Sequence, residues 1–237
     1  MSGPRRKPGL WLLAAMFLML LLACPQSAYS AKLKFHSVAL GAVRTVPYSV
    51  EGDPSGALPN ETTLRVRPLV VDGRVKDWIT GEVHDVTDRS FTVRRAVRIN
   101  DALPTDRHVI WVWQRGPWLL VDRTSGKVTA LRLPDYDPAV SDVVWFRDYA
   151  AYCGLNASGK GLFAVVAQIA ARRPVLNKRL SAWNLADHST PACAGAVWQR
   201  NPLQVTFTPT GTAARSFALV GSSAMLVEDD DSGGTGN

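Results

Sequence analysis

Two short apolar runs around a polar turn constrain this chain more than any other feature. The runs are Tyr149–Leu155 and Leu162–Ala167, and the segment Asn156–Gly161 between them holds the Asn, Ser and Gly residues that favour turns. Apolar runs of this length separated by such a turn predict a buried β-hairpin. The Ala-rich second run also suits a helix that stops before Pro174, but we expect a strand.

Residues 1–30 carry the three parts of an export signal. A cationic start, Arg5–Lys7, precedes an apolar run, Leu10–Ala23, and a small-residue cleavage site, Ala28–Ser30. The apolar run is shorter than the ~20 residues that span a bilayer as a helix, so we expect cleavage and a periplasmic or extracellular protein. Cys24 follows a Leu-Leu-Ala sequence similar to a lipoprotein processing site, which leaves a membrane-anchored lipoprotein as the alternative.

Cleavage after Ser30 would leave two cysteines, Cys153 inside the predicted hairpin and Cys193. An isolated pair in an exported protein predicts a disulfide, with two free buried thiols as the alternative. The closed loop would add about 4 kcal/mol of stability. No His stands at ligand spacing from either cysteine, so we expect no metal there and no cofactor elsewhere.

Short strand-like runs bounded by turn residues predict a mainly β fold for the rest of the chain. We expect antiparallel meanders and hairpins, sandwich-like or partly propeller-like, after an N-terminal signal helix. The signal (1–30) is followed by a single β-rich domain (31–227) and a disordered acidic tail (228–237). The expected strands are one bent at Gly41, then Leu64–Val71, Val75–Ile79, Glu82–Asp88, Phe91–Ile99, Leu203–Thr208 and Arg215–Val220, with Val175–Trp183 either a strand or a loop.

The clearest local pattern is a three-stranded meander within Val109–Leu133. Its runs Val109–Trp113, Trp118–Val121 and Val128–Leu133 are separated by turn chemistry at Arg115–Pro117 and Arg123–Gly126. Farther on, Asp137 and Pro138 suit the start of a short helix that would run through Val144.

With these segments in view, Trp118–Leu133 resembles the inner hairpin of a β-propeller blade. Tyr149–Ala167 and Pro202–Val220 have the same style of hairpin at roughly a blade's spacing of about 40–50 residues. The chain also resembles a group of uncharacterised secreted bacterial proteins through Gly81–Arg89, Trp113–Gly116 and Trp145–Gly154. That resemblance implies export and a β-rich fold, and it implies no catalytic residue.

One cluster of polar residues is a candidate site. His84, Asp85 and Asp88 lie close together in sequence, and a His beside carboxylates suits acid–base or metal chemistry. In an extended strand His84 and Asp85 point to opposite faces, whereas Asp88 shares the face of His84. We expect a hydrogen-bonded turn there, with catalysis as the alternative. Asp135 and Asp137 flank Tyr136 in a second pair that suits a loop better than Ca²⁺.

Aromatic and cationic residues suggest binding surfaces. Trp111 and Trp113 share a strand face by alternation, and with Trp118 they form a candidate aromatic surface if exposed. Arg94 and Arg95 could bind anions on a sheet face, although a solvated face is the simpler interpretation. The formal net charge of +7 falls to +4 once the three cations of the signal are removed (7 − 3). A mildly basic mature chain is compatible with an anionic envelope polymer or lipid headgroups, but the scattered arginines are not typical of nucleic-acid binders.

The sequence therefore predicts an exported or periplasmic β-protein of the bacterial envelope with a binding or structural role. Its partner is unidentified, with an envelope polymer or protein the candidate and nucleic acid excluded. Two alternatives remain open: an envelope hydrolase that uses His84 with Asp85 or Asp88, and a lipoprotein assembly accessory anchored through Cys24. Motifs for phosphate loops, HExxH zinc sites, GxSxG nucleophiles and EF-hands are absent from the sequence.

Overall fold

The computed structural model describes residues 35–49, 62–169, 171–183, 192–221 and 223–227. The predicted signal, Cys24 and the acidic tail lie outside these residues. Within them the chain forms strands and turns with no α-helix, and no segment is a helix of sufficient length and apolarity to cross a membrane. The prediction of a mainly antiparallel β fold is therefore confirmed.

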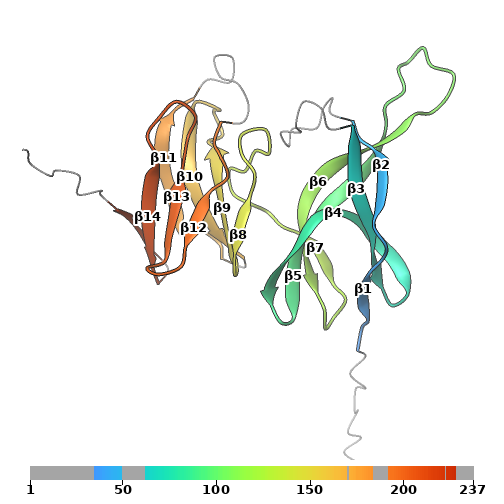
Figure 1. Ribbon diagram of the computed structural model, residues 1–237, viewed down its shortest axis with the longest axis horizontal. Coiled ribbons are helices and arrows are strands. Elements are labelled where there is room, and N and C mark those ends of the chain that lie inside the picture. The colour runs from blue at the N-terminus through green and yellow to red at the C-terminus, as the bar shows by residue number, and fades with distance from the viewer. Residues whose placement is uncertain (1–34, 50–61, 170, 184–191, 222, 228–237) are drawn as a thin grey trace, which may run out of the picture. The chain divides into compact units, whose positions relative to one another are not determined.

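The strands form three sheets that follow the chain in order (Figure 1). The first sheet has strand order β1-β3-β4-β5-β6-β7, with β2 also paired to β3; the second is β11-β10-β9-β8 and the third β12-β13-β14-β15. The strand bounds are β1 Val38–Leu40, β2 Arg44–Pro47, β3 Thr63–Val71, β4 Arg74–Thr87, β5 Ser90–Asn100, β6 Trp111–Asp122, β7 Val128–Ala130, β8 Val144–Phe146, β9 Tyr149–Leu155, β10 Gly161–Gln168, β11 Leu176–Ala182, β12 Val197–Gln199, β13 Gln204–Phe207, β14 Arg215–Val220 and β15 Ser223–Val227.

The first sheet curls until its ends meet. β1 and β2 both pair with β3 and are separated by an irregularity at Gly41, whose N–H donates to the carbonyl of Pro68. This confirms the predicted bend at Gly41. After β2, Tyr48 forms a parallel bridge with Trp113 at the start of β6. The bridge joins the end of β2 to β6, so the sheet closes at this corner and buries Val46, Leu64 and Trp113 in one cluster.

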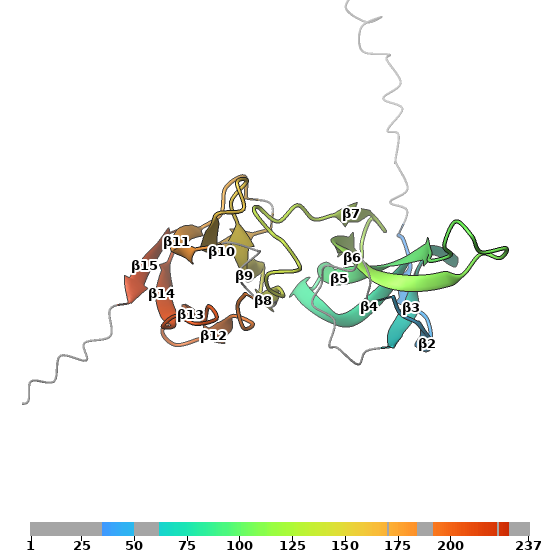
Figure 2. The same ribbon diagram turned by 90° about the horizontal axis from the view of Figure 1, so that it is seen from above.

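The second and third sheets pack face to face as a sandwich. Figure 2 shows them edge-on, with β8–β11 in one layer and β12–β15 in the other. One apolar cluster joins the layers, with Leu162 and Leu176 from the second sheet against Phe207 and Phe217 from the third. Each sheet is a four-stranded meander in chain order, so the hairpins β9–β10 and β13–β14 lie at their centres as the hairpin patterns predicted.

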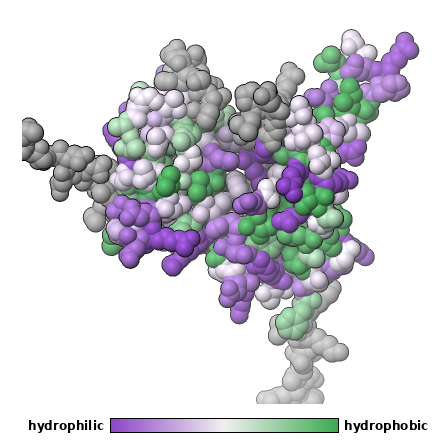
Figure 3. Space-filling view, in the orientation of Figure 1, coloured by the Kyte–Doolittle hydropathy of each residue, from purple (hydrophilic) through white to green (hydrophobic). Residues whose placement is uncertain are grey.

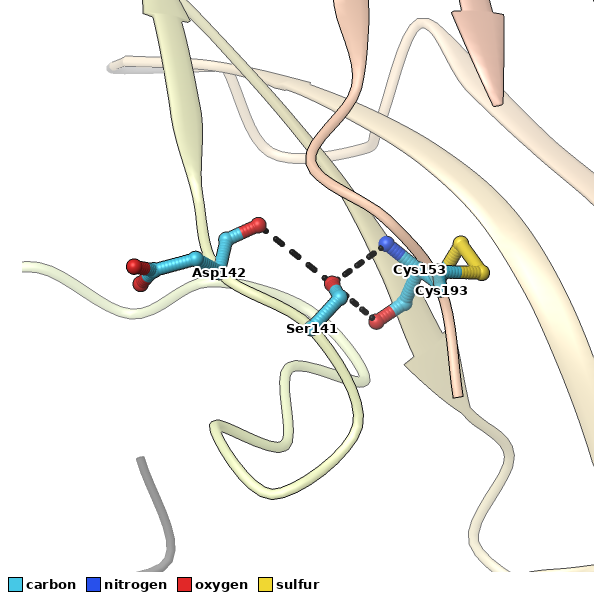
Figure 4. The surroundings of a disulfide bond; sticks show 4 residues. All are labelled: Ser141, Asp142, Cys153 and Cys193. Atoms are coloured by element: carbon cyan, nitrogen blue, oxygen red, sulfur yellow. Dashed lines mark hydrogen bonds between the residues drawn. A yellow bond between two sulfur atoms is a disulfide. The ribbon is translucent and has the colours of Figure 1, made fainter. Parts of the chain in front are cut away.

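A disulfide between Cys153 and Cys193 pins the sandwich, which confirms the predicted pair. Cys153 lies in β9, whereas Cys193 precedes β12 and bridges to Pro209. Beside the disulfide, the buried hydroxyl of Ser141 accepts a 2.8 Å hydrogen bond from the Cys153 N–H and lies 3.1 Å from the Cys153 carbonyl oxygen, to which it can donate (Figure 4). Ser141 thereby supplies the hydrogen-bond partners that the backbone of an adjacent strand would give Cys153 in β9.

Three local predictions are wrong. The runs Val75–Ile79 and Glu82–Asp88, expected as two strands, form the single strand β4. The predicted turn at Arg115–Pro117 is part of one continuous strand, β6, with a register shift opposite Arg94 and Ala96. A bulge accommodates Pro117, which cannot donate to a ladder, and a Cβ at Gly116 would lie 2.7 Å from a methyl group of Val97.

The third wrong prediction is the helix between Asp137 and Val144. The Asp137 side chain does accept the backbone N–H of Ala139, as in a helix cap, but only a turn follows. The chain then enters β8, because Val144 pairs with Ala151 in the second sheet. Pairing with a neighbouring strand outweighs the local preference for a helix.

Candidate functional site

Three side chains line up across the first sheet at the centre of the candidate site. The register places Thr80 of β4 opposite Arg94 of β5, and Arg94 opposite Trp118 of β6. Thr92, two residues from Arg94, lies on the same face. Thr80, Thr92 and Arg94 are all buried, so this part of the sheet face is polar and covered.

The segment Ser141–Trp145 covers this face. Arg94 donates from Nη1 to Oδ1 of Asp142 at 3.1 Å and from Nε to the carbonyl oxygen of Gly116, also at 3.1 Å. These bonds use two of the five N–H donors of the guanidinium, so Arg94 keeps donor capacity for a further acceptor. All these residues belong to the one compact unit that begins at Phe35.

Aromatic rings form one wall of the site. The His84 imidazole stacks on Trp145 with ring centroids 5.8 Å apart, and Trp145 meets Trp118 edge to face at 5.3 Å. The His84 Nε2 atom lies 2.7 Å from the backbone oxygen of Arg147, which fixes the ring. The Arg94 guanidinium lies over the Trp118 ring at 5.9 Å, within the range of a cation–π contact.

These groups surround a pocket of about 410 Å³. Its rim includes Gly81, Glu82 and Val83, which form an irregular segment of β4 between the paired residues Thr80 and His84. Gly81 has φ 76°, a conformation that favours glycine, and the bulge returns His84 to the sheet face beside Thr92. The pocket therefore has Arg94 with apolar aromatic surface, a usual combination for small-molecule sites.

The pKa of Tyr136 reflects its burial and the charges of Arg94 and Asp142. Its pKa is raised above the usual 10.0 mainly because burial disfavours the phenolate, while the positive charge of Arg94 opposes that shift and the negative charge of Asp142 reinforces it. The Tyr136 hydroxyl therefore stays protonated at neutral pH beside the Arg94–Asp142 pair.

The predicted trio of His84, Asp85 and Asp88 does not converge. His84 faces Trp145, whereas Asp85 forms a 2.6 Å ion pair with Arg123. Asp88 lies exposed in the turn between β4 and β5. In that turn the Thr87 hydroxyl, rather than a carboxylate, accepts the backbone N–H of Arg89.

The three predicted tryptophans do not form one exposed surface. Trp113 is buried against Trp78, with ring centroids 5.6 Å apart, and Trp118 lies in the pocket wall. Trp111 is 47% exposed and contacts Arg98, whose guanidinium lies 4.3 Å from the ring. It is the first residue of β6, next to the loop that joins β5 to β6. That loop projects at the upper right of Figures 1 and 3 with apolar and polar residues side by side.

Carboxylates elsewhere take structural roles. Asp137 caps the turn at Ala139, and Asp135, with φ 55°, accepts a hydrogen bond from Asn177. Across the described ranges, no three His, Cys, Asp or Glu residues gather in a way that would hold a metal ion.

Sequence reasoning singled out Arg94 and His84 but missed Asp142 and Arg115 as pocket residues. Alternation shows that Arg94 and Arg95 point to opposite faces, and the structure buries Arg94 while Arg95 stays exposed in an ion pair with Asp77. The available signal was the presence of Arg residues inside the strand-like run Phe91–Ile99. Which of the two faces is covered depends on a segment 48 residues away.

Comparison with protein-family models, curated proteins and solved structures finds no match to this chain. The pocket chemistry is therefore the basis for assigning a function.

Proposed function

We propose that this protein is an exported, non-catalytic binding protein of the bacterial envelope that holds a small organic carboxylate in the Arg94 pocket. Export is supported by the signal-like pattern of residues 1–30 and by a disulfide, which is compatible with an oxidising compartment. Binding is supported by the pocket, because its polar groups suit recognition of a ligand.

The observation that carries the proposal is the burial of Arg94 beneath the pocket. Its side chain is 7% exposed, and it already binds a carboxylate, that of Asp142, through one nitrogen. A guanidinium can pair with both oxygens of a carboxylate, and such bonds strengthen when they are shielded from water. The ligand's carboxylate would take the place of the Asp142 carboxylate, and the ligand's apolar body would lie against Trp118 and Trp145.

Calorimetry with benzoate and benzamide tests the proposal, because the two probes share a shape and differ in charge. We expect the wild-type protein to prefer benzoate by about ten-fold or more, the effect of one hydrogen bond between charged groups. The Arg94→Gln variant should lose this preference. Arg95→Gln is the matched control, since it removes the same charge from the neighbouring residue on the opposite face.

Circular dichroism should show that both variants are folded. Equal binding of the two probes by the wild-type protein, or no binding of either, would show that the pocket does not recognise carboxylates. If Arg94→Gln unfolds the protein, Arg94→Lys keeps the positive charge without the planar fork and should reduce the preference for benzoate.

Intact mass of the protein from its natural envelope fraction tests export separately. We expect a chain that begins at Ala31 and whose thiols react with an alkylating reagent only after reduction. A chain that begins at Cys24 with an added acyl mass would instead support the lipoprotein alternative. A full-length chain with its first residues intact would contradict cleavage.

A further inference from the structure

A second cavity, separate from the Arg94 pocket, is lined by several arginines. It measures about 260 Å³ and lies between the segment after β7 and the segment after β10. Three of its lining residues are arginines, Arg132, Arg172 and Arg173, and all three side chains are exposed. None of the residues that line this cavity is acidic. We refer to it as the arginine cavity.

The walls of the arginine cavity are anchored to the folded core. Tyr152, which is fully buried, donates a 2.6 Å hydrogen bond to the carbonyl oxygen of Pro134. The backbone N–H of Leu131 donates to Trp118, and that of Ala171 donates to Gln168. The Gln168 side chain in turn donates a 2.7 Å hydrogen bond to the Asp148 carboxylate. The arginines therefore project from a backbone that is already held in place.

Apart from Gln168, the remaining lining is apolar. Leu131, Leu133 and Ile169 line the cavity together with Pro134 and Pro174. The cavity therefore combines apolar surface with three guanidinium groups, and a volume just below the ~300 Å³ lower bound for drug-sized ligands limits it to a small group. An anion with a short apolar chain matches both features.

The number of arginines in the cavity indicates which kind of anion it would bind. One arginine can satisfy a carboxylate by pairing with both of its oxygens, as proposed for Arg94. Three arginines offer far more donors and three positive charges. A phosphate monoester carries about −1.5 to −2 charges at neutral pH and three acceptor oxygens, so it matches this set better than a carboxylate does.

We infer that the arginine cavity binds the phosphate monoester end of an amphiphilic ligand. The phosphate oxygens accept hydrogen bonds from Arg132, Arg172 and Arg173, and the start of the ligand's alkyl chain lies on the leucines, isoleucine and prolines. The site is separate from the Arg94 pocket, with no lining residue in common. The phosphate can come from a soluble phosphate ester or from a lipid headgroup.

Calorimetry with octyl phosphate and with inorganic phosphate tests the inference on the intact mature protein. We expect octyl phosphate to bind at least ten-fold more tightly than inorganic phosphate, because only octyl phosphate uses the apolar lining. The double variant Arg172→Gln/Arg173→Gln should weaken octyl phosphate binding at least ten-fold. The matched control, Lys178→Gln/Arg179→Gln, removes two exposed charges from β11 of the same sheet and should change binding less than two-fold.

Sedimentation with vesicles identifies the source of the phosphate. Binding to phosphatidylcholine vesicles that contain phosphatidate, and not to phosphatidylcholine alone, would assign it to a lipid headgroup if Arg172→Gln/Arg173→Gln abolishes it. Binding of octyl phosphate without vesicle binding would assign it to a soluble ester. Equal losses in the two double variants, equal affinity for octyl and inorganic phosphate, or no binding of either phosphate probe would each overturn the inference.

Discussion

The Nη1 atom of Arg94 lies 3.1 Å from Oδ1 of Asp142, yet the Arg94 side chain is 7% exposed and that of Asp142 is 67% exposed. The cation is thus held within the protein, while its partner remains in contact with water. Displacing Asp142 costs little, because its carboxylate regains full hydration. The pair resembles a binding site occupied by an internal carboxylate.

We therefore predict that Asp142→Asn strengthens benzoate binding several-fold. The substitution keeps the size of the side chain but removes the negative charge that competes for Arg94. Because the substitution leaves the buried Arg94 guanidinium without a counter-charge but keeps a hydrogen-bond acceptor, we expect the free energy of unfolding to fall by about 1–3 kcal/mol. Calorimetry and urea denaturation measure the two effects. Weaker benzoate binding in this variant would show that Asp142 organises the pocket rather than competing for it.

The disulfide should contribute strongly to stability. It links residues 40 apart in sequence, and closure of a loop of that length in the unfolded chain predicts about 4 kcal/mol. We expect the double variant Cys153→Ala/Cys193→Ala to lose about this much, measured as the free energy of unfolding in urea. Reduction of the wild-type protein should have a similar effect. A change below about 1 kcal/mol would show that strain in the folded state offsets the loop-closure effect.

Ser141 should also contribute to the stability of the sandwich. Its buried hydroxyl bonds the backbone of Cys153, where β8 no longer pairs with β9. Ser141→Ala leaves a buried N–H without its acceptor, so we predict a loss of about 1–3 kcal/mol in urea denaturation. The control is Ser125→Ala, at an exposed turn, which should cost less than about 0.5 kcal/mol. Equal effects of the two substitutions would argue against this role.

The raised pKa of Tyr152 predicts that the stability of the protein falls at high pH. Burial raises its pKa well above the usual 10.0, and the negative charge of Asp135 raises it further. In the unfolded chain Tyr152 ionises near pH 10, whereas in the folded protein it stays protonated. Its contribution to stability is therefore fully present below pH 10 and is lost as the pH rises toward the folded-state pKa.

Urea denaturation at about pH 9 and about pH 11, on either side of the usual tyrosine pKa, measures this dependence. We expect a smaller decrease in Tyr152→Phe than in the wild-type protein, because that variant has no phenol to ionise at this position. An identical decrease in the two proteins would exclude Tyr152 as the cause. A titration followed by tyrosinate absorbance should show that the buried phenol ionises only when the protein unfolds.

The sequence by itself determined the features that depend on local residue preferences or on the number of cysteines. The hairpin of β9 and β10 follows from two apolar runs around a turn, and the Cys153–Cys193 disulfide follows from there being two cysteines in the expected mature chain. The residues of the first sheet's strands follow from their β-rich runs, but the continuity of β4 and β6 does not. Where a neighbouring strand competes with local preference, as at Arg115–Pro117 and Asp137–Val144, the local prediction is wrong.

Tertiary structure alone decided the Arg94 pocket. Alternation separates Arg94 from Arg95, but the burial of Arg94 depends on Asp142 and Trp145, which the chain brings across from distant positions in sequence. Likewise, Arg132 joins Arg172 and Arg173 only because the segment after β7 and the segment after β10 meet at one cavity. Hydrophobic periodicity and turn preferences depend on a few neighbouring residues. The side chains of a binding site come together through tertiary packing, which depends on the whole fold.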